Sequence, residues 1–144
     1  MLKTSKATLA ARILLGLIFF VFGLNGFLNF IPAPAEMPEK VMTFMNGIMA
    51  TGYFLPFLKG TETICGLLLL VGAFVPLALV VLAPIVLNIF LFHAFLEPSG
   101  LPLAVVIGGL MVYLSFFAAP YSAIVKQIFR CPMKEAMDAK KAAK

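Results

Sequence analysis

Four long apolar segments constrain this chain more than any other feature of its sequence. A transmembrane helix needs about 20 mostly apolar residues, and the sequence supplies such runs at about residues 7–31, 57–75, 79–96 and 101–125. Because 62% of its 144 residues are hydrophobic and only 12% are charged, a soluble fold would lack the polar residues to cover its surface. We therefore expect an all-α membrane protein whose transmembrane domain, residues 1–125, is a four-helix bundle.

The connections between these segments predict how the helices follow one another. Pro76 lies in a short link between the second and third spans, and residues 97–100 form a turn between the third and fourth. Such short links make consecutive helices antiparallel neighbours. The first connection is longer and more polar, and it contains apolar residues at spacings of three and four: Val41, Phe44, Met45, Ile48 and Met49. We expect a short interfacial helix there, between spans one and two.

Basic residues set the expected orientation in the membrane. Three lie before the first span or at its start, Lys3, Lys6 and Arg12, and three follow the last span, Lys126, Arg130 and Lys134. The two connections on the opposite side hold only Lys40 and Lys59, so the positive-inside rule places both termini in the cytoplasm. Residues 126–144 then form a basic cytoplasmic tail that can lie against anionic lipid. Its few charges and lack of interleaved aromatic residues do not favour nucleic-acid binding.

The two cysteines predict no disulfide within the chain. Cys65 lies in the second span near the outer face, whereas Cys131 follows the fourth span on the cytoplasmic side. At about 1.5 Å per helical residue, this separation far exceeds the roughly 7 Å that a disulfide can bridge. No Cys-x-x-Cys pair is present, so a dithiol relay within this chain is not favoured.

Six polar side chains stand out within the spans or at their ends, where an ionisable group at the helix centre costs roughly 2.5–3.5 kcal/mol. Asn25 and Asn29 are four residues apart, as are His93 and Glu97, so each pair shares a helix face. Counted from the helix ends, these four and Glu62 lie within about two turns of the outer boundary and form one layer. Asn88 is deeper and, about 140° around its helix from His93, must face a different neighbour. The candidate polar pocket therefore comprises Asn25, Asn29, Glu62, Asn88, His93 and Glu97.

The residue types in this layer leave three interpretations open. In the first, the layer is structural, and hydrogen bonds between helices contribute about 0.6 kcal/mol each. In the second, it is a pocket where Glu62 and His93 face each other and exchange protons with a redox lipid such as a quinone, since histidine titrates near neutral pH. In the third, Glu62, His93 and Glu97 bind a metal, but a single nitrogen ligand makes this less favoured, and we expect no metal. A haem is less favoured still, since His93 has no evident His or Cys partner for the other axial position.

The order of several short motifs resembles the DoxX family of small bacterial four-span membrane proteins. The resemblance covers about residues 11–119 and rests on the positions of Asn25, Glu62, Asn88 and His93 within recognisable segments. These segments are RILLGLIF at 12–19, FGLNGF at 22–27, TGY at 51–53, GLLL at 66–69, APIVLNI at 83–89 and Phe92-His93.

The resemblance implies a bacterial inner-membrane protein with a role in redox metabolism. Relatives are associated with membrane-linked sulfur and quinone oxidation and with thiol or oxidative-stress homeostasis, often beside another redox protein. It implies an accessory or quinone-interacting subunit. It leaves the cofactor unknown, with a quinone as the candidate, and it assigns no catalytic residue. Two alternatives stay open: a small proton-coupled transporter that uses Glu62, and a structural assembly factor without chemistry.

Overall fold

The computed structural model describes residues 4–143, in which the regular elements are all helices. Four helical segments are long and apolar enough to cross a membrane. They are α1 (Lys6–Leu28), α3 (Phe54–Val71), α4 (Val75–Phe95) and a fourth span built from η1 (Pro98–Gly100), α5 (Leu101–Val112) and the π-helical η2 (Tyr113–Phe117). The short helix expected between the first two spans is α2 (Glu39–Ala50), and α6 (Tyr121–Gln127) and α7 (Pro132–Ala142) follow the last. The predicted all-α four-span fold is confirmed.

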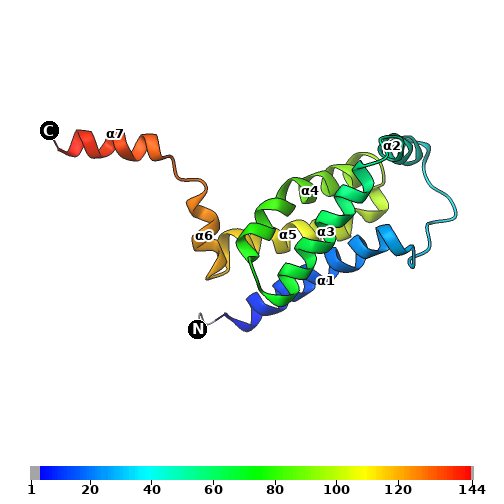
Figure 1. Ribbon diagram of the computed structural model, residues 1–144, viewed down its shortest axis with the longest axis horizontal. Coiled ribbons are helices and arrows are strands. Elements are labelled where there is room, and N and C mark those ends of the chain that lie inside the picture. The colour runs from blue at the N-terminus through cyan, green and yellow to red at the C-terminus, as the bar shows by residue number, and fades with distance from the viewer. Residues whose placement is uncertain (1–3, 144) are drawn as a thin grey trace.

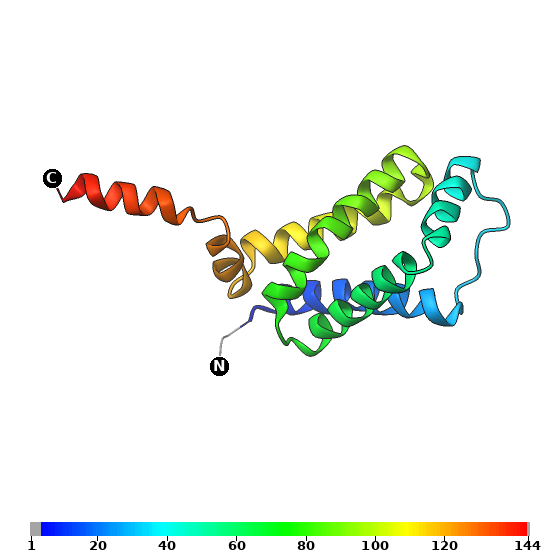
Figure 2. The same ribbon diagram turned by 45° about the horizontal axis from the view of Figure 1, so that its top comes forward.

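The four spans lie side by side, and the remaining helices occupy the two ends of the bundle (Figure 1). At one end, which we name the α2 end, α2 follows the long loop that leaves α1 (Figure 2). At the other, which we name the terminal end, α1 begins and η2 ends, and α6 and α7 lead away from the bundle. An even number of spans therefore brings both chain ends to the same end of the bundle.

Several helix ends differ from the boundaries that hydropathy predicts. The second span begins at Phe54 rather than at 57 and ends at Val71, where Gly72 takes the left-handed conformation. Pro76, expected in the link, lies in the first turn of α4, where a proline is tolerated because the first amide groups have no helical partner. The fourth span ends at Phe117 rather than at 125, and α6 begins directly after Pro120.

Close contact between α1 and α3 depends on glycines that face each other. A Cβ atom on Gly16 would lie 3.0 Å from the Leu69 Cβ, and one on Gly66 would lie 2.8 Å from the Phe20 Cα. A Cβ on Gly23 would lie 3.0 Å from the Thr63 Cα. As residue numbers rise along α1 they fall along α3, so the two helices are antiparallel. Small residues let membrane helices approach closely in this way.

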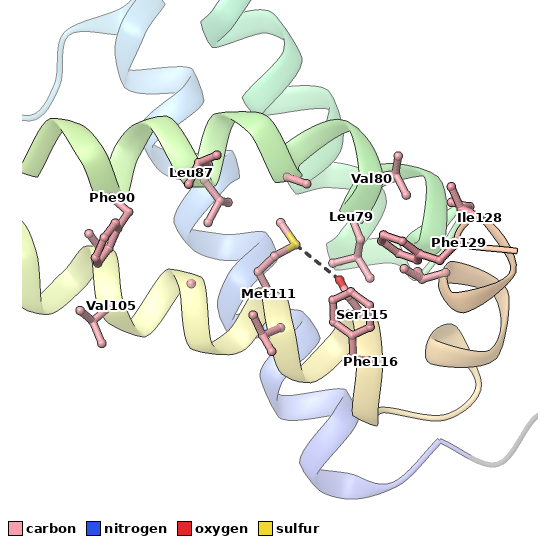
Figure 3. A pocket seen from close by; sticks show the side chains of 16 residues that line it. Leu79, Val80, Leu87, Phe90, Val105, Met111, Ser115, Phe116, Ile128 and Phe129 are labelled. Carbon is pink, nitrogen blue, oxygen red and sulfur yellow. Dashed lines mark hydrogen bonds between the residues drawn. The ribbon is translucent and has the colours of Figure 1, made fainter. Parts of the chain in front are cut away.

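A groove of about 530 Å³ runs along one side of the bundle, where α4 meets α5, η2 and α6 (Figure 3). Its walls are almost entirely apolar, with Leu79, Leu87 and Phe90 from α4 facing Val105 and Met111 from α5. Its polar side chain, Ser115, donates a hydrogen bond to the Met111 sulfur at 3.7 Å. The groove can therefore contact an apolar molecule, but no titratable side chain lines it.

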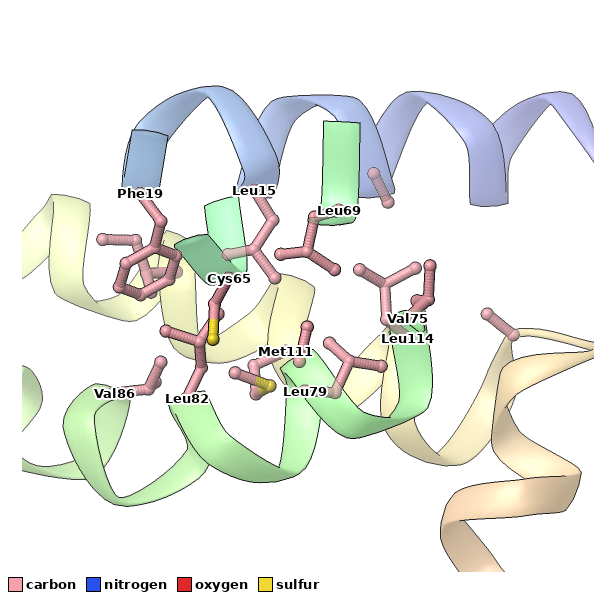
Figure 4. Packing of buried hydrophobic residues seen from close by; sticks show 14 of the residues in the cluster. Leu15, Phe19, Cys65, Leu69, Val75, Leu79, Leu82, Val86, Met111 and Leu114 are labelled. Carbon is pink, nitrogen blue, oxygen red and sulfur yellow. The ribbon is translucent and has the colours of Figure 1, made fainter. Parts of the chain in front are cut away.

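The buried core lies where all four spans meet, towards the terminal half of the bundle (Figure 4). Leu15 from α1, Leu69 from α3, Leu79 and Leu82 from α4 and Leu114 from η2 are almost wholly buried. Beyond this core, the Thr8 and Tyr113 hydroxyls lie 3.2 Å apart and share a hydrogen bond that links α1 to η2. The core thus forms an apolar, leucine-rich layer between the terminal end and the polar residues near the α2 end.

Candidate functional site

A smaller cavity, of about 190 Å³, lies between the spans in the half of the bundle nearer the α2 end. All four spans contribute to its walls, which combine aromatic and aliphatic side chains with three titratable ones. The lining residues are Ile18, Phe19, Phe22, Lys59, Glu62, Ile89, His93, Leu103 and Ile107. Because Glu62 and His93 both line it, two of the six predicted site residues are brought to one cavity.

Glu62 is held on the cavity wall by an ion pair within α3. Its Oε2 atom lies 2.9 Å from the Lys59 Nζ, three residues earlier and therefore on the same helix face. The Glu62 side chain is 5% exposed and that of Lys59 is 24% exposed. A buried carboxylate in a membrane span needs such a partner to offset its desolvation. The pair therefore places one hydrogen-bond acceptor and one donor beside the cavity.

The stem of Lys59 occupies space that Gly26 leaves open on α1. A Cβ atom on Gly26 would lie 2.9 Å from the Lys59 Cβ and 2.7 Å from its Cδ. Any larger residue at this position would displace the lysine side chain. Gly26 thus has a role beyond helix packing, because it allows the Lys59 ammonium to reach Glu62.

His93 enters the cavity from the last turn of α4 and is fixed by the turn that follows. Its Nδ1 atom donates a hydrogen bond to the Glu97 carbonyl oxygen at 3.1 Å, since a carbonyl can only accept. The Glu97 carboxylate lies 3.7 Å from the same nitrogen. Gly100 packs against the ring, and a Cβ there would overlap it. In the neutral ring this bond leaves Nε2 as a hydrogen-bond acceptor.

Three other predicted site residues serve the local structure around the cavity and do not line it. The Asn25 side chain accepts a hydrogen bond from the Ile31 amide at 2.7 Å, which fastens the loop after α1. Asn29 ends α1 in the left-handed conformation, with φ 49°, and its backbone N–H donates a hydrogen bond to the Asn25 carbonyl oxygen at 2.9 Å. Glu97 fixes the His93 ring through the contacts of its carbonyl oxygen and carboxylate with Nδ1. These residues shape the ends of α1 and α4.

Asn88 lies outside the candidate pocket. It is exposed on α4, while Leu82 and Val86, on the opposite side of the same helix, are buried in the core. The expectation that Asn88 faces a different neighbour from His93 therefore agrees with its position, but that neighbour is not another helix of this bundle. Asn88 does not line the cavity that Glu62 and His93 share, because it lies on an exposed face of α4.

The predicted polar layer also differs from the structure in depth and pairing. Because α3 begins three residues earlier than expected, Glu62 lies more than two turns into the helix, near its middle. It pairs with Lys59, which was expected only as a charge of the connection before the second span. The signal was nevertheless present, since Lys59 and Glu62 stand three apart on one predicted helix. His93 and Glu62 line the same cavity without an ion pair between them.

The remaining candidate features are metal-ligand clusters, the two cysteines and the larger groove. Among residues 4–143, no three His, Cys, Asp or Glu side chains come close enough to hold a metal ion. Cys65 is buried, Cys131 is exposed, and both are free thiols. The larger groove beside α4 is lined by no titratable side chain. The smaller cavity, with Lys59, Glu62 and His93, is therefore the candidate functional site.

Comparison with known proteins gives one match. The family model of DoxX matches residues 7–94, which span α1, α2, α3 and nearly all of α4 and include Lys59, Glu62 and His93. No curated protein and no solved structure matches the chain. The family match covers more than half of the sequence and includes the first three of the four spans described above. The chain belongs to the DoxX family of membrane proteins.

Proposed function

We propose that this protein is a membrane subunit that binds the ring of a quinone in the cavity formed by Lys59, Glu62 and His93. The observation that supports this proposal most is the meeting of these three side chains on one small cavity whose other walls are apolar. In this role the chain acts as an accessory subunit in membrane-linked redox or thiol and oxidative-stress metabolism, beside a redox protein that exchanges electrons with the quinone.

The size of the cavity suits a quinone ring. A cavity of about 150 Å³ holds one benzene molecule, so about 190 Å³ accommodates one substituted ring. Phe19 and Phe22 offer aromatic contact to its faces. A drug-sized ligand needs about 300 Å³ or more, so the long isoprenoid tail must remain in the surrounding lipid.

The polar groups match the two functional ends of a quinone ring. Its carbonyl oxygens accept hydrogen bonds, and the Lys59 ammonium is a donor held in place by Glu62. In the reduced quinol these oxygens become hydroxyl donors, for which the Glu62 carboxylate and the His93 Nε2 are acceptors. One site can therefore bind both redox forms and accept or supply protons.

Proton-coupled transport by Glu62 is less well supported. Glu62 does lie near the middle of its helix, as a transport carboxylate would. However, it is paired with Lys59, and the leucine-rich core separates it from the terminal end. A transported ion or molecule would have to cross this apolar layer, whose side chains cannot replace its hydrogen bonds to water.

Binding is tested by titrating the purified chain, in detergent, with decylubiquinone and following its thermal unfolding. A ligand that binds only the folded state stabilises it by about 2.7 kcal/mol at a hundredfold excess over Kd, so the melting temperature should rise with ligand concentration. Decanol, which carries a similar chain without the ring, is the matched ligand control, and Glu36→Gln, in an exposed loop, is the matched protein control. An equal response to decanol and decylubiquinone would contradict ring recognition.

We also propose that the protein resides in the bacterial inner membrane with its terminal end, and the basic tail of residues 126–144, in the cytoplasm. The support is the basic residues that flank α1 and follow the fourth span. Cys131 is exposed and Cys65 is buried, so a membrane-impermeant maleimide should modify Cys131 only after cells are opened. A Glu36→Cys variant should be modified in intact cells. Labelling of Cys131 from outside intact cells would reverse the orientation.

A further inference from the structure

The outward face of α4 carries a polar side chain where lipid would otherwise be its only neighbour. Asn88 stands thirteen residues after Val75 and seven before Phe95, near the middle of the span. It is exposed, and its side chain makes no hydrogen bond within residues 4–143. An amide in hydrocarbon without a hydrogen-bond partner is costly. The position of Asn88 therefore indicates a partner outside the bundle.

Asn88 belongs to a regular stripe along the helix. The exposed residues on this face recur at alternating spacings of four and three, the repeat of a coiled-coil seam. They are Leu77, Val81, Pro84, Asn88, Leu91 and Phe95. The buried residues of α4 lie on the opposite side, and the Phe44 ring of α2 packs against Phe92, outside the stripe, with 5.3 Å between the ring centroids. Phe95, at the end of the stripe, remains 74% exposed.

We propose that this stripe is a homodimer interface, in which α4 of one chain packs against α4 of a second copy and the two Asn88 side chains bond to each other. A carboxamide contains both a donor and an acceptor, so it complements a copy of itself across a two-fold axis. The other residues of the stripe are uncharged, so no like charges are brought together. A single asparagine in an apolar seam fixes the register and number of helices.

Replacing Asn88 by leucine should weaken this dimer, whereas the same change in the seam of a water-soluble coiled coil would add apolar burial. Helices in lipid gain nothing from burying further apolar surface, so Asn88→Leu removes the hydrogen bond without a compensating gain. With about 0.6–1.7 kcal/mol per bond between membrane helices, this variant should weaken dimerisation about 3- to 20-fold. Ile64→Leu, on the exposed face of α3, is the matched control and should leave it unchanged.

The experiment combines mass determination with cross-linking of the full chain. In mild detergent, light scattering should give twice the 15.6 kDa chain mass for the wild type and a larger monomer fraction for Asn88→Leu at the same dilution. In native membranes, Leu91→Cys in a Cys65→Ser, Cys131→Ser background should form a disulfide-linked dimer on oxidation, whereas Ile64→Cys should not. The proposal would be overturned if the wild type were monomeric in detergent and Leu91→Cys formed no cross-link in membranes. Cross-linking of Leu91→Cys only to a protein of another mass would also overturn it.

Discussion

Replacing both Lys59 and Glu62 by methionine should lower the affinity for decylubiquinone about 10- to 100-fold while the protein still folds. The two residues form an ion pair at 2.9 Å on the cavity wall. Replacing both partners of a buried ion pair by apolar groups of similar size changes the free energy of unfolding little. A hydrogen bond to a charged group contributes about 1.5–3 kcal/mol to binding, and about 1.4 kcal/mol is tenfold in affinity. The decylubiquinone titration measures this loss directly.

Single substitutions separate binding from stability. Glu62→Gln leaves the Lys59 ammonium without its counter-charge, so we expect a lower melting temperature as well as weaker binding. His93→Phe keeps a ring against Gly100 but removes both nitrogens, so binding should weaken with little loss of stability. A double methionine variant that binds decylubiquinone like the wild type would show that the ion pair serves only the local structure of α3 and takes no part in recognition.

Substituting Gly66 by leucine should prevent α1 and α3 from packing and cost at least about 3 kcal/mol, the upper part of the range for overpacked sites. A Cβ at this position would already lie 2.8 Å from the Phe20 Cα and 2.9 Å from the Phe19 carbonyl carbon. Both are backbone atoms, which cannot move aside as the end of a flexible side chain can. The melting temperature in detergent and the yield of folded protein measure the effect.

Gly109→Leu supplies the matched control for this prediction. Gly109 is exposed on α5, and a Cβ atom built there meets nothing within 4 Å. We expect this variant to fold and melt like the wild type, although the substitution is the same. Equal destabilisation by both variants would mean that the glycines act through helix flexibility, and the close α1–α3 contact would lose its assigned role.

Hydropathy predicted the four spans well because length and apolar content alone decide which segments can cross a bilayer. It predicted their ends less well because local backbone conformation sets them. Gly72 and Phe74 both adopt positive φ values, 78° and 51°, and turn the chain between α3 and α4 within a few residues. Pro120, just after the fourth span, interrupts a run that still reads as apolar up to Val125.

The candidate site was predictable only in part, because sequence spacing shows which residues share a helix face but not which face meets another helix. Glu62 and His93 lie on faces turned towards the bundle, and they meet at one cavity. Asn25 and Asn29 also share a face, yet they lie where α1 ends, so their polar groups are used by the backbone. Asn88 is on the face of α4 that the other spans leave uncovered.

Photolabelling with an azido-substituted quinone tests the central claim, that the Lys59, Glu62 and His93 cavity binds the ring, most directly. After illumination of the purified protein, mass spectrometry of its peptides shows where the ring was bound. We predict adducts on the cavity-facing turns of α3 and α4, around Glu62 and His93, and their loss when excess decylubiquinone competes. Adducts confined to the apolar groove, around Leu87 and Val105, or labelling that excess decylubiquinone does not reduce, would contradict it.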